Sequence, residues 1–540
     1  MEKRIFGPPG CGKTFTLCHK IIPEMMQKYG SDKVMITSFT KTAAIHIATE
    51  AKKIIPEINI DDQQFGTLHS ICYNAIGKTP LVDTKIWNEE HGDPEWKISR
   101  GNPDQSDDAG AGKLYNEYQI LRNKLSPIET WPQVIQDFHS DWYEYKRKKG
   151  SIDYTDMIEI ALQDLPIPPF KVQCIVTDET QDLTPLQMKL IRSWGQSIPE
   201  YYLSLDDDQA IFSFSGVDIK SVLLPEIPIE NKIFLQQSYR VPQKPHAYAM
   251  KISDKISFRE PKNYLSTNEI GNVSMGYNMS IDEPKEMLNL INDLTGTSMI
   301  MASCAYMLQH TTSMMKEMGL PFHNPYKPSD RRLNPMNTKA SNMLYNFLET
   351  GEDEKYWSTQ QLLGWIKNIK VSTKTTPGLL KVQGKKLITM LEEEMIKGTE
   401  GLHTCREYLT DLFHTDAIEP ALNRDLDWLK SVCNATIKKS LEYPLSIIDK
   451  NNNNHKILNE TPKIVIGTIH SFKGTEADNV FVAPDISWSA QQEWMSSVEA
   501  KDNMHRLFYV AVTRTLDNLI LLQPGSSSRS NYYQFPSIPE

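Results

Sequence analysis

The sequence has few cysteines and no long apolar run, and each of these absences excludes a class of protein. Its 540 residues include seven cysteines, and no two of them are separated by only two residues. Neither a disulfide framework nor a cysteine-based zinc site is therefore expected, and a reducing compartment suits the chain better. Because no run reaches the about 18 apolar residues of a membrane helix, and because the first residues lack an apolar stretch, we expect a cytoplasmic protein with no membrane partner.

An excess of positive charge is also missing. The chain has 58 lysines and arginines against 68 aspartates and glutamates, which gives a net charge of −10. This balance excludes a uniformly basic coat for nucleic acid, although a local groove can be positive on an acidic protein. Hydrophobic residues make up 39% of the chain, which is enough for a sizeable core, and the length suggests about three to four domains.

Short apolar runs occur in two clusters and predict two α/β units. They alternate with longer amphipathic stretches, which is typical of parallel sheets covered by helices. The runs are residues 34–39, 174–178, 201–205 and 233–235 in the first cluster, and 298–301, 463–468, 479–482 and 519–522 in the second. Two segments without such runs are predicted to be mainly helical insertions, the first with a polar loop at 101–112. The predicted organisation is a first domain of residues 1–74 and 150–238 with an insertion at 75–149, a second domain of residues 239–326 and 456–524 with an insertion at 327–455, and a flexible tail at 525–540.

The strongest local motif is a glycine-rich loop near the start of the chain. From residue 7 onwards, Gly-Pro-Pro-Gly-Cys-Gly-Lys-Thr fits the phosphate-loop pattern at every fixed position. Gly7, Gly10 and Gly12 would let backbone N–H groups surround a phosphate, Lys13 would place a charge on it, and the Thr14 hydroxyl could hold Mg²⁺. A helix is predicted to follow, to about residue 29. The loop by itself indicates only a binder of nucleoside triphosphates.

Acidic residues follow one of the predicted buried strands directly. Residues 174–177 are followed by Asp178 and Glu179, which would lie where the crevice of a parallel sheet opens. Asp178 could hold Mg²⁺, and Glu179 could polarise an attacking water.

A similar pattern follows the next strand of the same cluster. Three aspartates precede Gln209, which could respond to a γ-phosphate, and Phe212 and Phe214 come soon after. The two rings could stack on bases, or they could simply pack in the core.

Together with six further segments, these motifs resemble those of superfamily 1A DNA helicases of the UvrD/Rep/PcrA type. The resemblance runs from residue 7 to about residue 522, with every motif in the family's order. Besides the phosphate loop and motifs II (178–182) and III (206–216), the matching segments are 37–44 (motif Ia), 67–70, 152–157, 235–240 (motif IV), 467–476 (motif V) and 506–514 (motif VI).

The resemblance implies two RecA-like P-loop domains with parallel sheets, each carrying a mainly helical insertion, with ATP bound between them. Thr14 and Asp178 would hold Mg²⁺, Glu179 would activate water, and Gln209 would couple the γ-phosphate to DNA.

The same resemblance assigns roles to residues of the later motifs. Arg240 and Arg514 would reach the γ-phosphate from the second domain, where they would stabilise the charge of the transition state. Tyr239 would stack on the adenine, and Gly474 and Glu476 would lie near the ribose and phosphates. An isolated arginine is more often part of a surface salt bridge, so only the motif context supports these two assignments.

For DNA, the resemblance points to a mostly aromatic set of side chains. Stacking tolerates any base, so such contacts need not recognise sequence. The basic run at residues 146–149 is a further candidate contact, although a solvated helix end is an equally good interpretation. The predicted DNA-binding residues are Phe39, His69, Phe212, Phe214 and His470.

The sequence also departs from the family. Phe214-Ser215 stands where the family has Trp-Arg, so one charged contact is lost, and Leu68 replaces an aromatic residue. Only six residues precede the phosphate loop, which leaves no room for the family's adenine-reading glutamine, and we expect weaker discrimination of ATP from other nucleotides. The second insertion looks short, and the compact architecture suits a viral or mobile-element version acting in a bacterial or infected-cell cytoplasm.

The resemblance implies a DNA-dependent ATPase that uses ATP and Mg²⁺. The leading hypothesis is a DNA helicase that moves 3′ to 5′ on single strands, a direction carried over from the family, and that acts at duplex junctions with replication or repair proteins. One alternative is a translocase that strips proteins from single-stranded DNA and unwinds poorly without a partner. RNA as the substrate also stays open. The intact hydrolytic residues argue against a non-enzymatic DNA-binding module.

Overall fold

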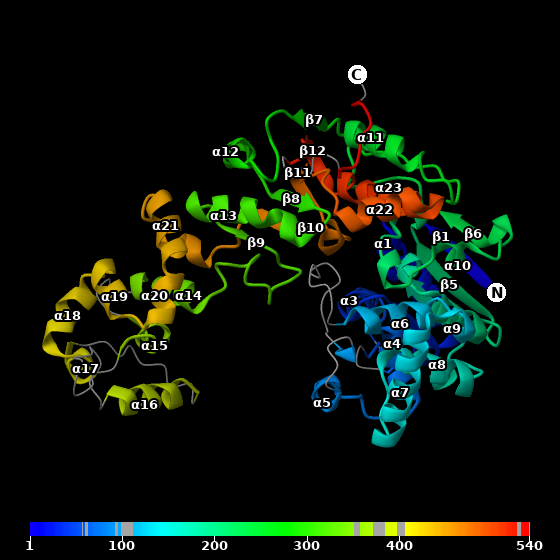
Figure 1. The fold of residues 1–540 in the computed structure, drawn as a ribbon, viewed down its shortest axis with the longest axis horizontal. Coiled ribbons are helices and arrows are strands. Elements are labelled where there is room, and N and C mark those ends of the chain that lie inside the picture. Colours follow the sequence, from blue (N-terminus) through cyan, green and yellow to red (C-terminus); the bar gives the residue numbers. More distant parts are fainter. Residues whose placement is uncertain are drawn as a thin grey trace.

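The computed structural model describes residues 1–56, 58–59, 63–91, 96–98, 112–349, 357–370, 384–396, 406–525 and 531–538. Within them the chain forms two α/β domains, each built on a six-stranded parallel sheet (Figure 1). This confirms the predicted fold class. The predicted polar loop at 101–112 lies almost wholly outside the described residues. No helix in the described ranges is long and apolar enough to cross a membrane.

The sheet of the first domain has the order β3-β2-β4-β5-β1-β6. Its central strands are buried at every position, as expected of a sheet that is covered on both faces. Four strands were not among the predicted runs: β1 and β3 in this sheet, and β7 (Asn272–Gly276) and β9 (Phe322–His323) in the sheet of the second domain. The strands of this sheet are β1 (Glu2–Phe6), β2 (Val34–Ser38), β3 (Phe65–Gly66), β4 (Cys174–Asp178), β5 (Glu200–Leu205) and β6 (Lys232–Phe234).

Helices cover both faces of this sheet. Along β4 the side chains alternate, with Ile175 in one apolar cluster and Cys174 and Val176 in the other. The helix predicted from residue 13 to 29 is interrupted by a π-helical segment at Leu17–Ile21. The helices of the first domain are α1 (Lys13–Thr16), α2 (Ile22–Tyr29), α3 (Lys41–Lys52), α4 (Leu68–Ala75), α8 (Tyr154–Asp164), α9 (Pro185–Gly195) and α10 (Ile219–Leu223).

The sheet of the second domain has the order β7-β12-β11-β8-β10-β9. In β12, Leu519 and Leu521 face one apolar cluster while Ile520 and Leu522 face the other. The elements of this domain are β7 (Asn272–Gly276), β8 (Ser298–Ala302), β9 (Phe322–His323), β10 (Ile464–Thr468), β11 (Ala477–Val482), β12 (Thr515–Leu522), α11 (Gln243–Ser253), α12 (Lys285–Asp293), α13 (Gln309–Glu317), α22 (Trp488–Ser496) and α23 (Val498–Val512).

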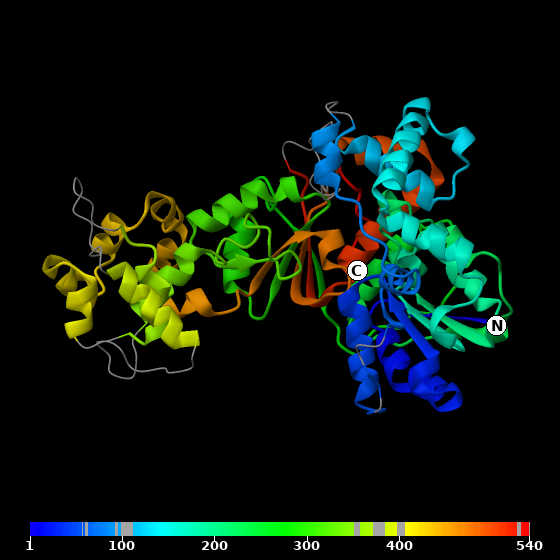
Figure 2. The same ribbon diagram turned by 90° about the horizontal axis from the view of Figure 1, so that it is seen from below.

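Two helical segments interrupt the domains. The first lies beside the first domain and consists of α5 (Thr84–Glu90), α6 (Lys113–Asn123) and α7 (Gln133–Lys149), around an aromatic core of its own. The second extends away from the first domain in both views (Figures 1 and 2). It consists of α14 (Lys339–Leu348), α15 (Thr359–Ile366), α16 (Gly384–Ile396), α17 (Arg406–Leu412), α18 (Thr415–Leu422), α19 (Leu426–Val432), α20 (Ala435–Ser440) and α21 (Glu442–Lys450).

The described part of the tail, residues 531–538, packs on the second domain. Tyr533 is 1% exposed and stacks on Phe508 of α23 at 4.1 Å between ring centroids. The Tyr248 hydroxyl donates to the main-chain oxygen of Pro536 at 3.0 Å. The prediction of a flexible tail is therefore wrong for these residues, because the burial of aromatic rings outweighs the polar composition around them.

Candidate functional site

The register of the first sheet brings the predicted site residues to one edge. Phe6 pairs with Leu205, and Ser38 pairs with Asp178. Because all the strands are parallel, their carboxyl ends face the same crevice. The phosphate loop, Phe39, the motif II carboxylates and the motif III aspartates leave the sheet at these ends. Strand alignment therefore assembles residues that are up to about 200 positions apart in the chain.

The phosphate loop has the backbone that its glycines predict. Gly10 and Gly12 have φ angles of 75° and 72°, in the left-handed region that favours glycine. A Cβ atom on Gly7 would come within 2.4 Å of Lys13 Cγ, so the lysine side chain folds closely over the loop. Lys13 Nζ donates to the main-chain oxygen of Gly7 at 2.6 Å. The ammonium is thus held at the mouth of the loop, where a phosphate would lie.

Asp178 has the surroundings of a cation ligand. It is buried and accepts hydrogen bonds from the Thr14 hydroxyl at 3.0 Å and from Ser204 at 2.9 Å. Burial, together with the neighbouring Glu179, raises the pKa of Asp178. A carboxylate and a hydroxyl form the hard oxygen set that Mg²⁺ prefers, so these residues fit that ion. Sequence reasoning missed Ser204, because a serine inside an apolar strand carries no motif.

Glu179 occupies a strained backbone position directly after β4. Its φ of 52° is in the left-handed region, which costs free energy for a residue with a side chain. Its carboxylate accepts a hydrogen bond from Gln181 and lies 3.8 Å from Lys473 Nζ. Burial raises the pKa of Glu179, but the charges of Lys473 and Lys13 and the bond from Gln181 outweigh it, so the pKa lies below the usual value.

Gln209 and Arg514 join the two domains behind the carboxylates. Arg514 of the second domain is 1% exposed, and its Nη2 donates to Gln209 Oε1 at 2.9 Å. Gln209 Nε2 in turn donates to Asp206 at 2.7 Å. Burial, followed by the charge of Arg240, lowers the pKa of Arg514 to about 9. A buried cation at this point needs a negatively charged partner, which a nucleotide phosphate would supply.

The segment around Tyr239 is hydrogen-bonded to the phosphate loop. Tyr239 N donates to the main-chain oxygen of Gly10 at 2.9 Å, and the hydroxyls of Ser238 and Tyr264 both donate to Pro9 O at 2.9 Å. The Tyr239 side chain itself is 79% exposed. Its stacking on adenine stays a prediction, for which an exposed ring beside the loop is a suitable starting geometry.

Arg240 and Glu476 meet at the same mouth of the crevice. Arg240 Nε of motif IV donates a hydrogen bond to Glu476 of motif V. Gly474, with a φ of 84°, makes the turn before Glu476. The arginine is therefore paired with a carboxylate that is itself half exposed. Its contact with a γ-phosphate stays a prediction.

Four of the five predicted DNA-binding residues form one cluster across the two domains. Phe39 stacks on Phe212 at 5.2 Å, and Phe214 meets His470 of the second domain edge to face at 5.2 Å. Phe212 contacts both Phe214 and His470, at 5.9 and 6.0 Å. We call these four residues the aromatic cluster.

His69 does not belong to this cluster. Its ring meets Tyr154 edge to face at 6.2 Å, and burial lowers its pKa to about 4.

Lys473 and Asp182 were not assigned by sequence reasoning, yet they link the domains. Lys473 Nζ donates to both oxygens of Asp182 at 2.6 Å and to Gln209 O at 2.8 Å. Burial raises the pKa of Asp182 to about 7. Both residues lie within motifs that sequence analysis found. One sequence does not show, however, that Lys473 pairs with Asp182, because the two are far apart in the chain.

A second buried charge cluster holds the motif III aspartates. Lys262 Nζ lies 2.6 Å from Asp207 and 2.8 Å from Asp208, and Arg259 lies 2.6 Å from Asp208. Lys262 is almost wholly buried. The cluster fixes the start of motif III and therefore the direction in which Gln209 points.

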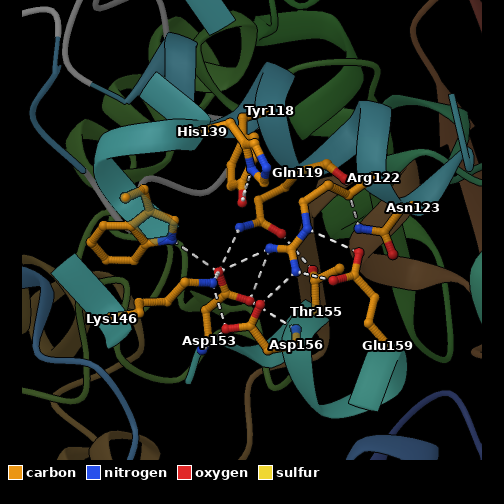
Figure 3. A network of polar contacts seen from close by, with 11 residues as sticks. Tyr118, Gln119, Arg122, Asn123, His139, Lys146, Asp153, Thr155, Asp156 and Glu159 are labelled. Atoms are coloured by element: carbon orange, nitrogen blue, oxygen red, sulfur yellow. Dashed lines mark hydrogen bonds and ion pairs between the residues drawn. The ribbon is translucent and has the colours of Figure 1, made fainter. Parts of the chain in front are cut away.

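The basic run at 146–149 is not a free cationic surface. Lys146 is 4% exposed and bonds to Asp153 at 2.8 Å and to Asp156, within a network centred on Arg122 (Figure 3). Arg147 and Lys149 pair with nearby glutamates. The hypothesis of a DNA contact is therefore wrong for Lys146, because α7 turns that side chain towards the start of α8.

Comparisons with known proteins agree with this geometry. A family model described as the UvrD/REP helicase N-terminal domain matches residues 3–91, and one described as the UvrD-like helicase C-terminal domain matches residues 423–523. The chain is similar to the ATP-dependent DNA helicase PcrA of Bacillus subtilis, with 24% identity over 298 residues, which cover 48% of this chain and 39% of that protein. It is also similar to PcrA of Staphylococcus epidermidis and of Staphylococcus aureus, with 23% and 24% identity over 291 residues, 49% of this chain and 40% of those proteins.

The chain thus spans about two fifths of the length of these relatives. The first family model matches the start of the first α/β domain, and the second matches the end of the second helical segment together with the last three strands of the second domain. Motif residues from the two matched regions meet where Arg514 binds Gln209. In these regions the chain is therefore similar to the UvrD/Rep/PcrA-type superfamily 1A helicases.

Proposed function

We propose that the protein is an ATP-dependent DNA helicase that moves 3′ to 5′ on single-stranded DNA and unwinds duplex DNA. One observation carries this proposal: the aromatic cluster spans both domains, and Lys473 links its Phe212 ring to Asp182 of motif II and to the main-chain oxygen of Gln209, whose side chain Arg514 binds across the crevice. A motor needs such a connection, because ATP hydrolysis between the two domains must change how tightly each domain binds the strand.

The chain's own residues supply the parts of a hydrolytic site. Lys13, Arg240 and Arg514 would neutralise charge on the phosphates, and Glu179 would accept a proton from the attacking water. Asp178 and Thr14 would hold Mg²⁺, which when bound with ATP supplies further charge neutralisation at the phosphates. Because Arg514 comes from the second domain, hydrolysis would depend on the closure of the crevice.

Binding of single strands is supported by the character of the aromatic cluster. Phe39 and Phe214 are 39% and 37% exposed, which is unusual for large apolar rings. Stacking on such rings does not depend on the base. We accordingly propose single-stranded DNA and duplex junctions as the substrates, and replication or repair proteins as partners in replication, repair or recombination.

Strand displacement tests the proposal. Two duplexes of the same sequence, one with a 3′ single-stranded tail and one with a 5′ tail, are incubated with the protein, ATP and Mg²⁺. We expect displacement from the 3′ tail only, and none with Glu179→Gln. Displacement from the 5′ tail alone would contradict the proposed direction, and an equal yield with Glu179→Gln would contradict an ATP-driven step.

A second candidate is a translocase that displaces proteins from single-stranded DNA and unwinds poorly without a partner. Ser215 supports this candidate, because it stands where the family has an arginine and brings no charge to DNA. Its hydroxyl instead donates to the main-chain oxygen of Phe212 at 2.7 Å. Release of streptavidin from a biotinylated 5′ end, together with DNA-stimulated hydrolysis but no strand displacement, would identify this activity.

A further inference from the structure

Lys473 of the second domain touches both the hydrolytic carboxylates and the aromatic cluster. Besides its bonds to Asp182 and to the main-chain oxygen of Gln209, its ammonium lies 5.2 Å from the centroid of the Phe212 ring. The same ammonium lies 3.8 Å from Glu179 Oε2. Only 9% of the lysine side chain is exposed. With little water to screen it, the charge acts strongly on its neighbours.

The loop that carries Lys473 also carries a residue of each neighbouring site. His470, three positions earlier, contacts Phe212 at 6.0 Å. Glu476, three positions later, binds Arg240 beside the phosphate loop. A displacement of this short loop by a base at the rings would therefore move the ammonium relative to the carboxylates.

We propose that Lys473 is a positioning residue that couples nucleic acid at the aromatic cluster to the action of Glu179 on water. Without nucleic acid, the ammonium stays between Asp182 and Glu179 and restrains the Glu179 carboxylate by an ion pair. A nucleobase that stacks on Phe212 competes for the ring face over which the ammonium lies, and it shifts the loop through His470. The ammonium then moves away from Glu179, and hydrolysis accelerates. This inference rests on the proposed function, because it requires an ATPase that binds nucleic acid.

The contacts of the ammonium support this direction of effect. It lies 2.6 Å from both oxygens of Asp182 and 3.8 Å from Glu179 Oε2, so it holds the Glu179 carboxylate by an ion pair. Loss of the ammonium would release this carboxylate.

The test measures ATP hydrolysis by the full chain, without DNA and with saturating oligothymidylate. In Lys473→Met and Lys473→Gln we expect a higher rate without DNA and a stimulation ratio that falls about fivefold or more, the size of a typical coupling. Lys473→Arg, which keeps the charge, should keep most of the ratio. Lys463→Met removes an exposed lysine next to β10 and serves as the matched control.

The comparison of rates with and without DNA separates this role from a structural one. A structural defect would lower both rates, whereas loss of the coupling raises the rate without DNA and lowers only the stimulation ratio. If the methionine variant does not fold, Lys473→Gln, which keeps a hydrogen-bond donor, decides the question.

Two results would overturn the inference while the proposed function stands. One is an equal loss of rate with and without DNA, which would make Lys473 a phosphate ligand or a structural residue. The other is an unchanged basal rate and stimulation ratio. If the wild-type chain is not stimulated by oligothymidylate at all, the proposed function and the coupling both fail.

Discussion

The crevice between the two domains has two ends that are built on different principles. At the nucleotide end, Asp178, Gln209 and Arg514 are buried, and each is fixed by partners at 2.7–3.0 Å. At the aromatic end, rings meet at 5.2–6.0 Å, and two of them are more than a third exposed. Directional bonds suit a reaction that tolerates little displacement, whereas stacking suits a polymer whose bases change with every step.

The largest effect is expected at the nucleotide end. Glu179→Gln removes the carboxylate that we propose as the proton acceptor from water, so the rate of ATP hydrolysis should fall about 10²- to 10⁴-fold. Steady-state hydrolysis with saturating DNA measures it. The matched control is Glu493→Gln, which changes an exposed glutamate of α22. A variant that retains more than a tenth of the rate would remove Glu179 from the chemistry.

A buried charge network outside the crevice should affect stability instead of rate. Arg122→Met leaves the buried Asp153 and the partly buried Asp156 with fewer partners, which costs about 3–5 kcal/mol of unfolding free energy. Urea denaturation measures the change. Arg147→Met, which removes an exposed arginine of the neighbouring helix, should cost much less. Equal costs for the two variants would contradict the view of Arg122 as the centre of a stabilising network.

At the aromatic end, a single ring should matter less. Phe39→Ala is expected to weaken binding of single-stranded DNA by about 1–3 kcal/mol, the value of one stacked base. Fluorescence anisotropy with labelled oligothymidylate measures the affinity, and Tyr277→Ala, at a tyrosine that is 75% exposed on the second domain, is the control. If both variants bind equally well, Phe39 does not contact the strand.

The smallest effect concerns His69, the predicted DNA-binding residue that lies outside the cluster. Burial lowers its pKa from 6.5 to about 4, so the unfolded chain binds more protons than the folded chain between these values. Stability from this residue is complete above pH 6.5 and is lost as the pH falls towards 4. In His69→Asn, the melting temperature should therefore fall less steeply over this range.

His505 provides the comparison for that measurement. Burial also lowers its pKa to about 4, so it should retain its own share of the pH dependence in the His69 variant. Identical slopes for wild type and His69→Asn would mean that His69 is not held in its neutral form.

Much of the crevice could be predicted because motif residues follow the ends of apolar strands. The run before Asp178 indicated a buried strand, and parallel pairing then placed Asp178 opposite Ser38 and beside the phosphate loop. The second domain was predicted for the same reason, since β8, β10, β11 and β12 are all apolar runs. Short strands such as β3 and β9, with two residues each, carry too few side chains to form a pattern.

Other features depend on partners that are distant in the chain. Lys146 belongs to a run of four basic residues, which a sequence alone cannot divide into exposed and buried members. The tail looked flexible because it is polar, yet Tyr533 finds an apolar surface on α23. The π-helical segment after the phosphate loop likewise has no marker in the residues that form it.

The sequence by itself determined the two α/β domains, the resemblance to the helicase family and the candidates for the hydrolytic residues, because strand patterns and motifs are local properties of the chain. Only the tertiary structure decided which charges are paired, which rings meet and which lysine joins the two ends of the crevice. These contacts join side chains from segments up to about 300 residues apart. Their strength depends on burial, because charges interact more strongly and unpaired polar groups cost more free energy away from water.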